Sequence, residues 1–351
     1  MCARIGRPAI LKSWPKFLLL LLILAGCGES KEPLKRSIYH WKSTFTLGDS
    51  DIQKLDSLGI RRLYVRYFDI DKEGAQLKPK GVLQWEANFP ENRELVPCVY
   101  ITNRAMAFLP DTAVETLALH VYSKILKLNK GIQAPIPEIQ MDCDWTPETK
   151  DKYFHFLDVM HRLCSEQKWQ LSATIRLHQV KYPETTGIPP IDRGMLMVYN
   201  MGDLKSPDEP NSILNRDLTA LYTDRLGEYP LELDVALPLY SWVIHFRGGE
   251  LQALRSSWNR EDLENDTLFQ KLDHTHYLAR ENSLYKGQYI LKNDQFRIEE
   301  IAPKLDIDII NDLSSRWNEP PKILSLFHYN PYEIEHHSCK DIEEIYRVAA
   351  E

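Results

Sequence analysis

Several patterns that identify a protein's chemistry at once are missing from this sequence. It has no Gly-x-Ser-x-Gly motif, no P-loop and no glycine-rich phosphate turn after its first predicted strand. A serine hydrolase or a nucleotide-dependent enzyme therefore has no support. Basic runs are also missing beyond the N-terminal segment, and 43 lysines and arginines are outnumbered by 50 aspartates and glutamates. We therefore expect no nucleic-acid partner.

Metal-binding patterns are scarce as well. None of the six cysteines stands at the spacing of a zinc site, and Cys98 and Cys143 fall inside predicted strands, where a free thiol packs as a small hydrophobic group. This favours free cysteines over a disulfide framework. Residues 69–74 resemble the start of a calcium loop, but Lys80 stands where that loop needs its final glutamate. We expect neither a metal nor a cofactor.

The one long hydrophobic run lies at the N-terminus. Four basic residues precede an uncharged, leucine-rich stretch at 17–25, which is the order of a secretory signal peptide. The stretch is about half as long as a helix that spans a bilayer, and it ends in Leu-Ala-Gly-Cys at 24–27, similar to a lipobox. Acyl chains add about 0.8 kcal/mol of membrane affinity per buried methylene. We predict a signal peptide at 1–26, lipid on Cys27 and a lipidated tether at 27–36.

These features predict a bacterial lipoprotein of the cell envelope, held to a membrane by its lipid, with its folded part outside the cytoplasm. An uncleaved signal anchor is the alternative. No later stretch approaches the 18 or more apolar residues of a spanning helix. The residues after Cys27 do not distinguish the inner from the outer membrane.

Beyond the tether, strand-like and helix-like runs alternate, as in a parallel α/β sheet or barrel. The candidate strands are 37–44, 62–68, 95–102, 136–144, 170–177, 195–201, 231–240 and 323–329. The amphipathic segments include 112–129, 148–167, 211–225, 303–316 and 339–349. Eight strands is the number of a (β/α)8 TIM barrel, which we predict for residues 37–351. A doubly wound open sheet is the competing fold, but the missing phosphate turn counts against it.

Residues 245–300 interrupt the alternation after the seventh strand. They hold one short helix near 260–272, followed by polar, β-prone runs. We therefore predict a small α+β lobe inserted into the barrel domain.

Strand alternation places polar side chains inside the barrel, because successive residues of a strand point to opposite faces. The inward residues of the fourth and fifth strands are Glu138, Gln140, Asp142, Asp144, Ser172, Thr174, Arg176 and His178. Other strands contribute Tyr39, Trp41, Tyr64, Arg66, Tyr199, Asp234 and Tyr240. Carboxylates and aromatic rings at the carboxyl ends of barrel strands suit a carbohydrate ligand. The alternative is a structural network in which Arg66 neutralises Asp142.

Three strand ends resemble the family 18 glycoside hydrolases, which include chitinases, endo-N-acetylglucosaminidases and inactive lectin-like relatives. Met141-Asp142-Cys143-Asp144-Trp145-Thr146 resembles the family's Asp-x-Asp-Trp-Glu on the fourth strand. Met197-Val198-Tyr199-Asn200 resembles Met-x-Tyr-Asp on the sixth strand, and Pro238-Leu239-Tyr240-Ser241 resembles Pro-x-Tyr-Gly on the seventh. The resemblance implies a TIM barrel that acts on an N-acetylated or related glycan.

Strand alternation and the resemblance together assign roles to two sets of residues. The candidate catalytic residues are Asp142, Asp144 and Tyr199. The candidate substrate-binding residues are Trp41, Arg66, Trp145, Arg176, His178, Asn200, Tyr240 and Trp242.

One departure from the family pattern separates two functions. The family's catalytic acid is the glutamate after Asp-Trp, where this chain has Thr146, and a hydroxyl cannot act as a general acid near neutral pH. If the register shifts by two residues, Asp144 becomes the acid, Asp142 orients the substrate's acetamido group and Tyr199 assists. Otherwise the chain is an inactive barrel that binds glycan, peptidoglycan or a protein partner. The chain also resembles uncharacterised bacterial barrels that keep Asp-x-Asp without the glutamate. We expect the protein to be a monomer.

Overall fold

The computed structural model describes residues 33–351. The predicted signal peptide, Cys27 and most of the tether lie outside the described residues, so lipidation stays a prediction. Among the helices of the described part, none has both the length and the apolar character needed to cross a membrane.

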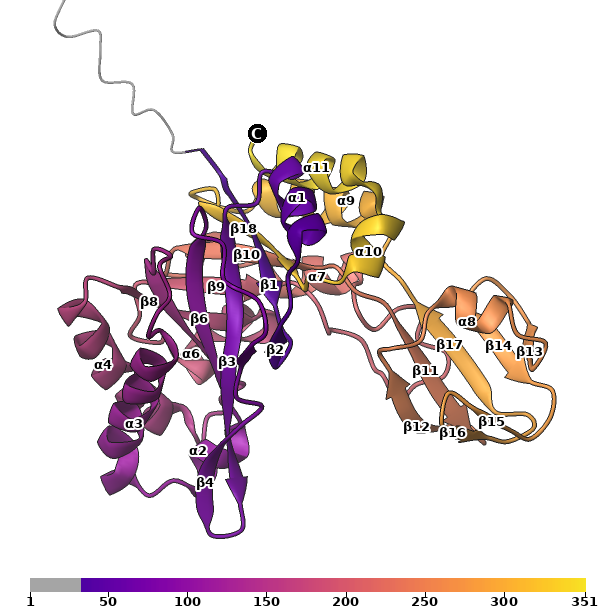
Figure 1. The fold of residues 1–351 in the computed structure, drawn as a ribbon, viewed down its shortest axis with the longest axis horizontal. Helices are drawn as coiled ribbons and strands as arrows, with labels where there is room; N and C mark the ends of the chain where they lie inside the picture. Colours follow the sequence, from indigo (N-terminus) through magenta and orange to yellow (C-terminus); the bar gives the residue numbers. More distant parts are fainter. Residues whose placement is uncertain (1–32) are drawn as a thin grey trace, which may run out of the picture. The chain divides into compact units, whose positions relative to one another are not determined.

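Eight parallel strands close into a barrel (Figure 1). In chain order they are β1 (Lys35–His40), β3 (Arg62–Glu73), β6 (Glu94–Ile101), β7 (Glu138–Asp142), β8 (Gln170–Arg176), β9 (Arg193–Met197), β10 (Leu233–Pro238) and β18 (Ile323–Phe327). Strand β1 pairs with both β3 and β18, which closes the ring. The predicted TIM barrel is confirmed, and each of these strands overlaps a predicted one.

Helices follow seven of the eight barrel strands. The longer helices are α1 (Asp49–Ser57), α3 (Val114–Leu128), α4 (Lys150–Glu166), α7 (Arg216–Tyr222), α9 (Pro303–Ser314) and α11 (Ser338–Ala349). The short ones are α2 (Asn103–Phe108), η1 (Asp111–Ala113), α5 (Leu177–Lys181), α6 (Pro183–Thr186), η2 (Leu226–Glu228) and α10 (Pro331–His336). Every longer helix except α1 occupies a predicted amphipathic segment.

The second barrel strand is the exception, because no helix follows it in the described chain. Strand β3 continues into an antiparallel hairpin with β4 (Gln76–Lys80), and β5 (Gln84–Trp85) then pairs with β2 (Thr44–Phe45). Gly74 at the hairpin tip has a φ of 59°, a conformation that favours glycine. The segment contains Pro79 and has no apolar residues at helical spacing, so nothing in it favours a helix.

A polar network fills the N-terminal end of the barrel interior. Arg62 donates to Glu138 at 2.9 Å, and Ser172 donates to the same carboxylate at 2.5 Å. Arg193 pairs with Asp234 at 2.6 Å. These side chains are almost excluded from solvent. The network is therefore part of the folded core.

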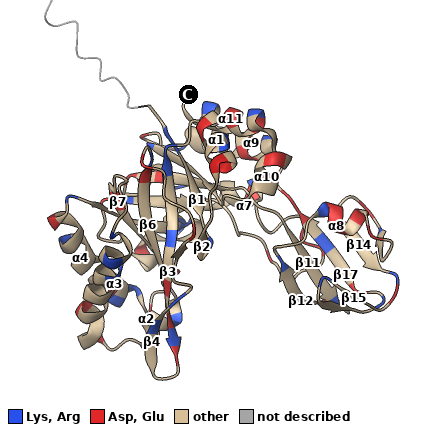
Figure 2. Cartoon of the chain, in the orientation of Figure 1, with Lys and Arg blue, Asp and Glu red and all other residues tan. Residues whose placement is uncertain are grey.

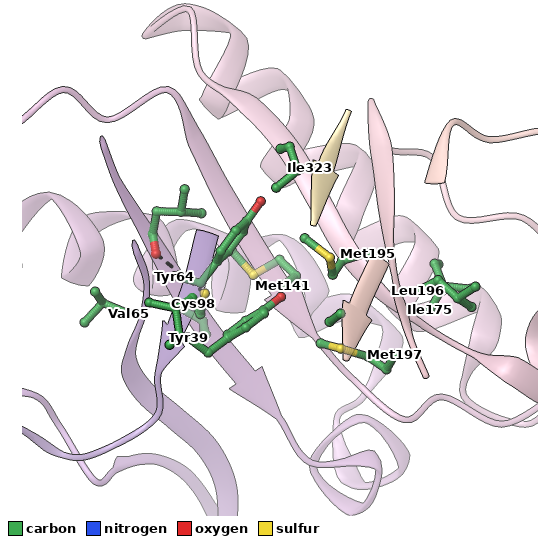
Figure 3. Close-up of a cluster of buried hydrophobic side chains, with 14 of the residues drawn as sticks. Tyr39, Tyr64, Val65, Cys98, Met141, Ile175, Met195, Leu196, Met197 and Ile323 are labelled. Atoms are coloured by element: carbon green, nitrogen blue, oxygen red, sulfur yellow. Dashed lines mark hydrogen bonds between the residues drawn. The ribbon is translucent and has the colours of Figure 1, made fainter. Parts of the chain in front are cut away.

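Aromatic and sulfur-containing side chains form the middle of the interior (Figure 3). The rings of Tyr39 and Tyr64 stack with their centroids 4.7 Å apart, and Met195 and Met197 lie on the facing wall. The Tyr39 hydroxyl donates to Gln140 at 2.7 Å. The barrel is thus filled by side chains at this level.

The segment after β10 forms a lobe with its own core. Its antiparallel sheet consists of β11 (Trp242–Arg247), β12 (Glu250–Arg255), β13 (Phe269–Lys271), β14 (His276–Ala279) and β17 (Gln295–Glu299), accompanied by α8 (Arg260–Glu264), β15 (Ser283–Tyr285) and β16 (Gln288–Ile290). Trp258, Phe269 and Phe296 lie at the centre of its core. The lobe has the predicted α+β character, but β11 begins at Trp242, before the predicted boundary at 245.

Basic and acidic residues both occur along the barrel helices and the lobe (Figure 2). The four cysteines of the described chain are free, with Cys98, Cys143 and Cys164 buried and Cys339 exposed. The preference for free cysteines is confirmed.

Candidate functional site

Two adjoining cavities open at the carboxyl ends of the barrel strands. The smaller cavity, of about 170 Å³, is lined by Trp41, Tyr100, Asp142, Asp144, Arg176, Tyr199, Asn200 and Phe327. The larger cavity, of about 380 Å³, is lined by Asp144, Arg176, Leu177, His178, Met197, Tyr199, Asn200, Met201 and Tyr222. Because four residues line both, we treat the two cavities as one site and call it the barrel mouth.

Two aspartates at the end of β7 form the acidic part of the barrel mouth. Asp142 is almost fully buried, and its Oδ1 accepts a hydrogen bond from Thr174 at 2.6 Å. Burial raises the pKa of Asp142, although Arg176 opposes the shift. The Asp144 side chain is 48% exposed. The site therefore offers one buried carboxyl group with a raised pKa and one accessible carboxyl group.

The guanidinium of Arg176, at the end of β8, contacts both aspartates. Its Nε donates to Asp144 at 2.5 Å, and one terminal nitrogen lies 3.8 Å from Asp142. Burial alone would lower the pKa of Arg176, but the two carboxyl groups raise it, so the guanidinium is charged. The predicted binding residue Arg176 is thus also the cation that balances the acids.

Arg66, to which the sequence assigned that balancing role, lies outside the barrel mouth. A bulge in β3 between Arg66 and Phe68 shifts the register against β6. The Arg66 guanidinium pairs with Asp69 at 2.8 Å and lines neither cavity. The balancing role assigned to Arg66 is therefore wrong, because its guanidinium pairs with Asp69, which the register shift brings close, and not with Asp142.

Aromatic rings form a wall of the smaller cavity. Tyr199 stacks on Phe327 with 5.0 Å between ring centroids, and Trp41 lies 5.5 Å from the same ring. The Tyr199 hydroxyl lies 3.0 Å from the sulfur of Met197, and burial raises its pKa well above the usual range. Phe327 was missed from the sequence, although it lies near the end of the eighth predicted strand, where the site was expected.

Asn200 adds an amide to both cavities. It follows β9 with a φ of 56°, a left-handed conformation that asparagine adopts more readily than most residues. Its side-chain oxygen accepts a hydrogen bond from the Tyr240 hydroxyl at 2.6 Å. Tyr240 lines neither cavity, so it positions Asn200 rather than forming part of the wall.

His178 lies at the rim of the larger cavity, on α5, and is exposed. Partial desolvation by the surrounding residues still lowers the pKa of His178, although Asp144 opposes the shift, so the imidazole is mostly uncharged at neutral pH. His178 can therefore exchange hydrogen bonds with a ligand without adding charge.

Two tryptophans predicted to bind substrate lie outside the walls of the barrel mouth. Trp145 is buried, and its Nε1 donates to the carbonyl of Thr186 at 2.8 Å. Trp242 donates to Glu299 at 2.7 Å and so links the first and last strands of the lobe. Both tryptophans have structural contacts, and neither lines a cavity.

Thr146 belongs to the turn that leads into α4. Its N–H donates to Thr149 Oγ1 at 2.9 Å. Among the described residues, the carboxyl groups that line the two cavities are those of Asp142 and Asp144. Acid catalysis here would have to use one of them. Within residues 33–351, no three His, Cys, Asp or Glu side chains are arranged to hold a metal ion.

No protein-family model and no curated protein matches this sequence. Solved structures do match. A chitinase from Chromobacterium violaceum superposes with a TM-score of 0.54 at 12% identity, over 90% of this chain and 98% of that one. The spore cortex-lytic enzyme SleL of Bacillus cereus gives 0.56 at 14% identity, over 91% and 74%. A Group IV chitinase of Ostrinia furnacalis gives 0.55 at 12% identity, over 91% and 100%. The chain therefore shares its fold with the chitinase-like TIM barrels that its strand ends resemble.

Proposed function

We propose that the barrel mouth binds a glycan and that the chain is a membrane-tethered, glycoside-hydrolase-like barrel. The observation that carries this proposal is the meeting of aromatic rings, two acids and an arginine in one open site at the carboxyl ends of the strands. Ligands of TIM barrels bind at this end. The chitinases and the spore cortex-lytic enzyme among the structures of similar fold support a glycan as the ligand.

The chemistry of the barrel mouth suits a sugar ring. Trp41 and Phe327 supply flat apolar surfaces for the C–H faces of a sugar, while Asp144 and Asn200 supply oxygens for its hydroxyl groups. The larger cavity, of about 380 Å³, lies within the size range of small-molecule sites. A sugar bound across the two cavities can therefore contact several of these side chains at once.

Binding without hydrolysis is the function that the geometry favours. Thr146 supplies no acid, and Asp144 forms an ion pair with Arg176. Asp142 is almost fully buried and already accepts a hydrogen bond from Thr174. A catalytic acid must come within hydrogen-bond reach of the glycosidic oxygen with its proton in place.

Hydrolysis is the second candidate, because the pKa of Asp142 is raised by burial. A carboxyl group that keeps its proton in this way can act as a general acid. In this case Asp142 would donate the proton, while Asp144 stays paired with Arg176. Tyr199 and Asp144 would then bind the sugar beside the bond that breaks.

A glycan screen on the full chain in detergent would separate these functions by measuring binding and the release of reducing ends together. We expect binding without release, and we expect Asp144→Asn to weaken it. Asp312→Asn is a matched control, because Asp312 pairs with Arg216 on the outer helices. Release that disappears in Asp142→Asn would establish a hydrolase instead. No binding to any glycan would contradict the proposal.

Attachment to the membrane through Cys27 is the second part of the proposal. It is supported by the order of basic residues, apolar stretch and lipobox-like segment in residues 1–27. Bacteria grown with labelled palmitate should incorporate label into the parent chain and not into Cys27→Ala. Cys339→Ala, which removes an exposed free thiol, is the control. Label that persists in Cys27→Ala would contradict lipidation at this residue.

A further inference from the structure

The protein itself uses only part of the Arg176 guanidinium. Its Nε–H donates to Asp144 at 2.5 Å. Within the described residues, the two terminal nitrogens donate no hydrogen bond, and one of them lies 3.8 Å from Asp142 Oδ1. The side chain is 23% exposed and lines both cavities. Charged donors that make no hydrogen bond within the described chain therefore lie in the wall of the barrel mouth, although one of them is near Asp142.

The other titratable groups in the site lie around these donors. Burial raises the pKa of Asp142, which Arg176 opposes, and burial lowers the pKa of His178. Burial also raises the pKa of Tyr100 to about 12. All three shifts favour the uncharged forms of these groups. Asp144 contacts the Nε side of the guanidinium and leaves the terminal nitrogens to a ligand.

A second cation lies next to a residue that lines the larger cavity. The Lys181 ammonium lies 5.5 Å from the centroid of the Tyr222 ring, which lines that cavity, and donates to the carbonyl of Leu221 at 2.6 Å. On the neighbouring helix α6, Glu184 is already paired with Arg225 at 2.9 Å. Lys181 thus keeps a positive charge near the barrel mouth that Glu184 does not balance.

We propose that the barrel mouth selects a sugar that carries a carboxylate, and that the terminal nitrogens of Arg176 bind this carboxylate. The proposal rests on the glycan-binding function proposed above. A guanidinium presents parallel N–H donors that match the two oxygens of a carboxylate, and such charge-assisted hydrogen bonds are stronger than neutral ones. Lys181 attracts the anion to the cavity. The carboxylate can belong to a uronic acid or to the lactyl ether of a muramic acid, since both present the same group.

Two matched pairs of ligands test this selection on the full chain in detergent. The disaccharide of N-acetylglucosamine and N-acetylmuramic acid differs from chitobiose by the lactyl ether, and digalacturonate differs from digalactose by its carboxylates. In calorimetry we expect at least one acidic ligand to bind about ten-fold more tightly than its neutral counterpart, as hydrogen bonds to charged groups do. The pair that shows the preference identifies the source of the carboxylate. Equal affinity within both pairs would overturn the selection.

Substitutions test whether Arg176 is the residue that selects the acidic ligand. Arg176→Lys keeps the charge but loses the fork of donors, so the preference for the acidic ligand should disappear. Arg216→Lys is the matched control, because Arg216 also pairs with an aspartate but lines neither cavity. A preference that survives in Arg176→Lys would overturn the proposal. Failure of all four ligands would contradict glycan binding itself, whereas binding without preference would remove only the selection.

Discussion

The two ends of the barrel interior contain the same kind of ion pair in different surroundings. At the N-terminal end, the side chains of Arg62 and Glu138 are 4% and 1% exposed, and their hydrogen bonds are made within the core. At the carboxyl end, the side chains of Arg176 and Asp144 are 23% and 48% exposed, and the terminal nitrogens of the arginine donate no hydrogen bond within the described chain. Exposure and unused hydrogen-bonding capacity, rather than residue type, therefore separate a structural pair from a candidate binding site.

The physical reason lies in solvation. Two buried charges depend on each other, because removing one leaves the other without water or partner. A pair at the mouth of a cavity is solvated, contributes little to stability and can exchange its partner for a ligand. The four predictions below test this contrast.

The largest effect on stability is expected at the N-terminal end of the barrel interior, where the ion pair is buried. Arg62→Met removes the cation that binds both Glu138 and Glu94, and should lower the free energy of unfolding by about 3–5 kcal/mol. Urea denaturation at pH 7 measures the loss. Arg216→Met, which breaks an exposed pair, should cost much less, because both charges of that pair remain solvated. Equal losses in the two variants would contradict the contrast.

At the barrel mouth, removing one charge of the ion pair should affect ligand binding more than stability. Asp144→Asn should lower the free energy of unfolding by less than about 1 kcal/mol, because the pair is solvated. Glycan affinity should fall about ten-fold or more, because an ionic acceptor is lost. Urea denaturation and calorimetry on the same protein measure both effects. A large loss of stability with unchanged affinity would place Asp144 among the structural residues.

Asp142 should make stability depend on pH. Burial raises the pKa of Asp142 in the folded state, while the unfolded chain titrates near about 3.9. The folded state therefore holds a proton that the unfolded state has lost, so this stabilisation is full below about pH 4 and disappears as pH rises through the folded pKa. Relative to the parent, Asp142→Asn should gain stability over that interval, by at most about 1.4 kcal/mol per pH unit. A difference that stays constant with pH would contradict this assignment.

The smallest effect is expected from a single aromatic ring. Trp41→Ala removes one flat surface from the smaller cavity and should weaken glycan binding about two- to ten-fold, the usual size of an aromatic contact. Calorimetry with the glycan identified by the screen measures the change. Trp317→Ala, near the start of β10, should leave the affinity unchanged. An equal loss in both variants would show a general effect on the fold.

Much of the site could be located from local sequence pattern. Alternation along the fourth strand placed Asp142 and Asp144 on one side, and both line the smaller cavity. The same argument did not foresee the partner of Arg66, which pairs with Asp69 across a register shift that follows it in β3. This shift depends on pairing with the neighbouring strand β6, and no local sequence pattern indicates it.

The contacts of aromatic residues could not be predicted from local sequence pattern either. Trp145 matched a family motif, yet it follows Asp144 and so turns toward the helices, where it bonds to Thr186. Phe327 belonged to no motif, yet it forms the wall against which Tyr199 and Trp41 lie. A motif names the residue type at a position, whereas the ring's contacts come from strands distant in the chain.

By itself the sequence determined the eight strands, the inserted lobe and the carboxyl end at which the acids gather. These features follow from period-two alternation, apolar runs and their order along the chain, which are local properties. Only the tertiary structure decided that Arg176, rather than Arg66, contacts the acids, and that its terminal nitrogens donate no hydrogen bond within the described chain. Arg176 and Asp144 are separated by 32 positions and meet through the register of neighbouring strands, which barrel closure fixes and no local pattern encodes.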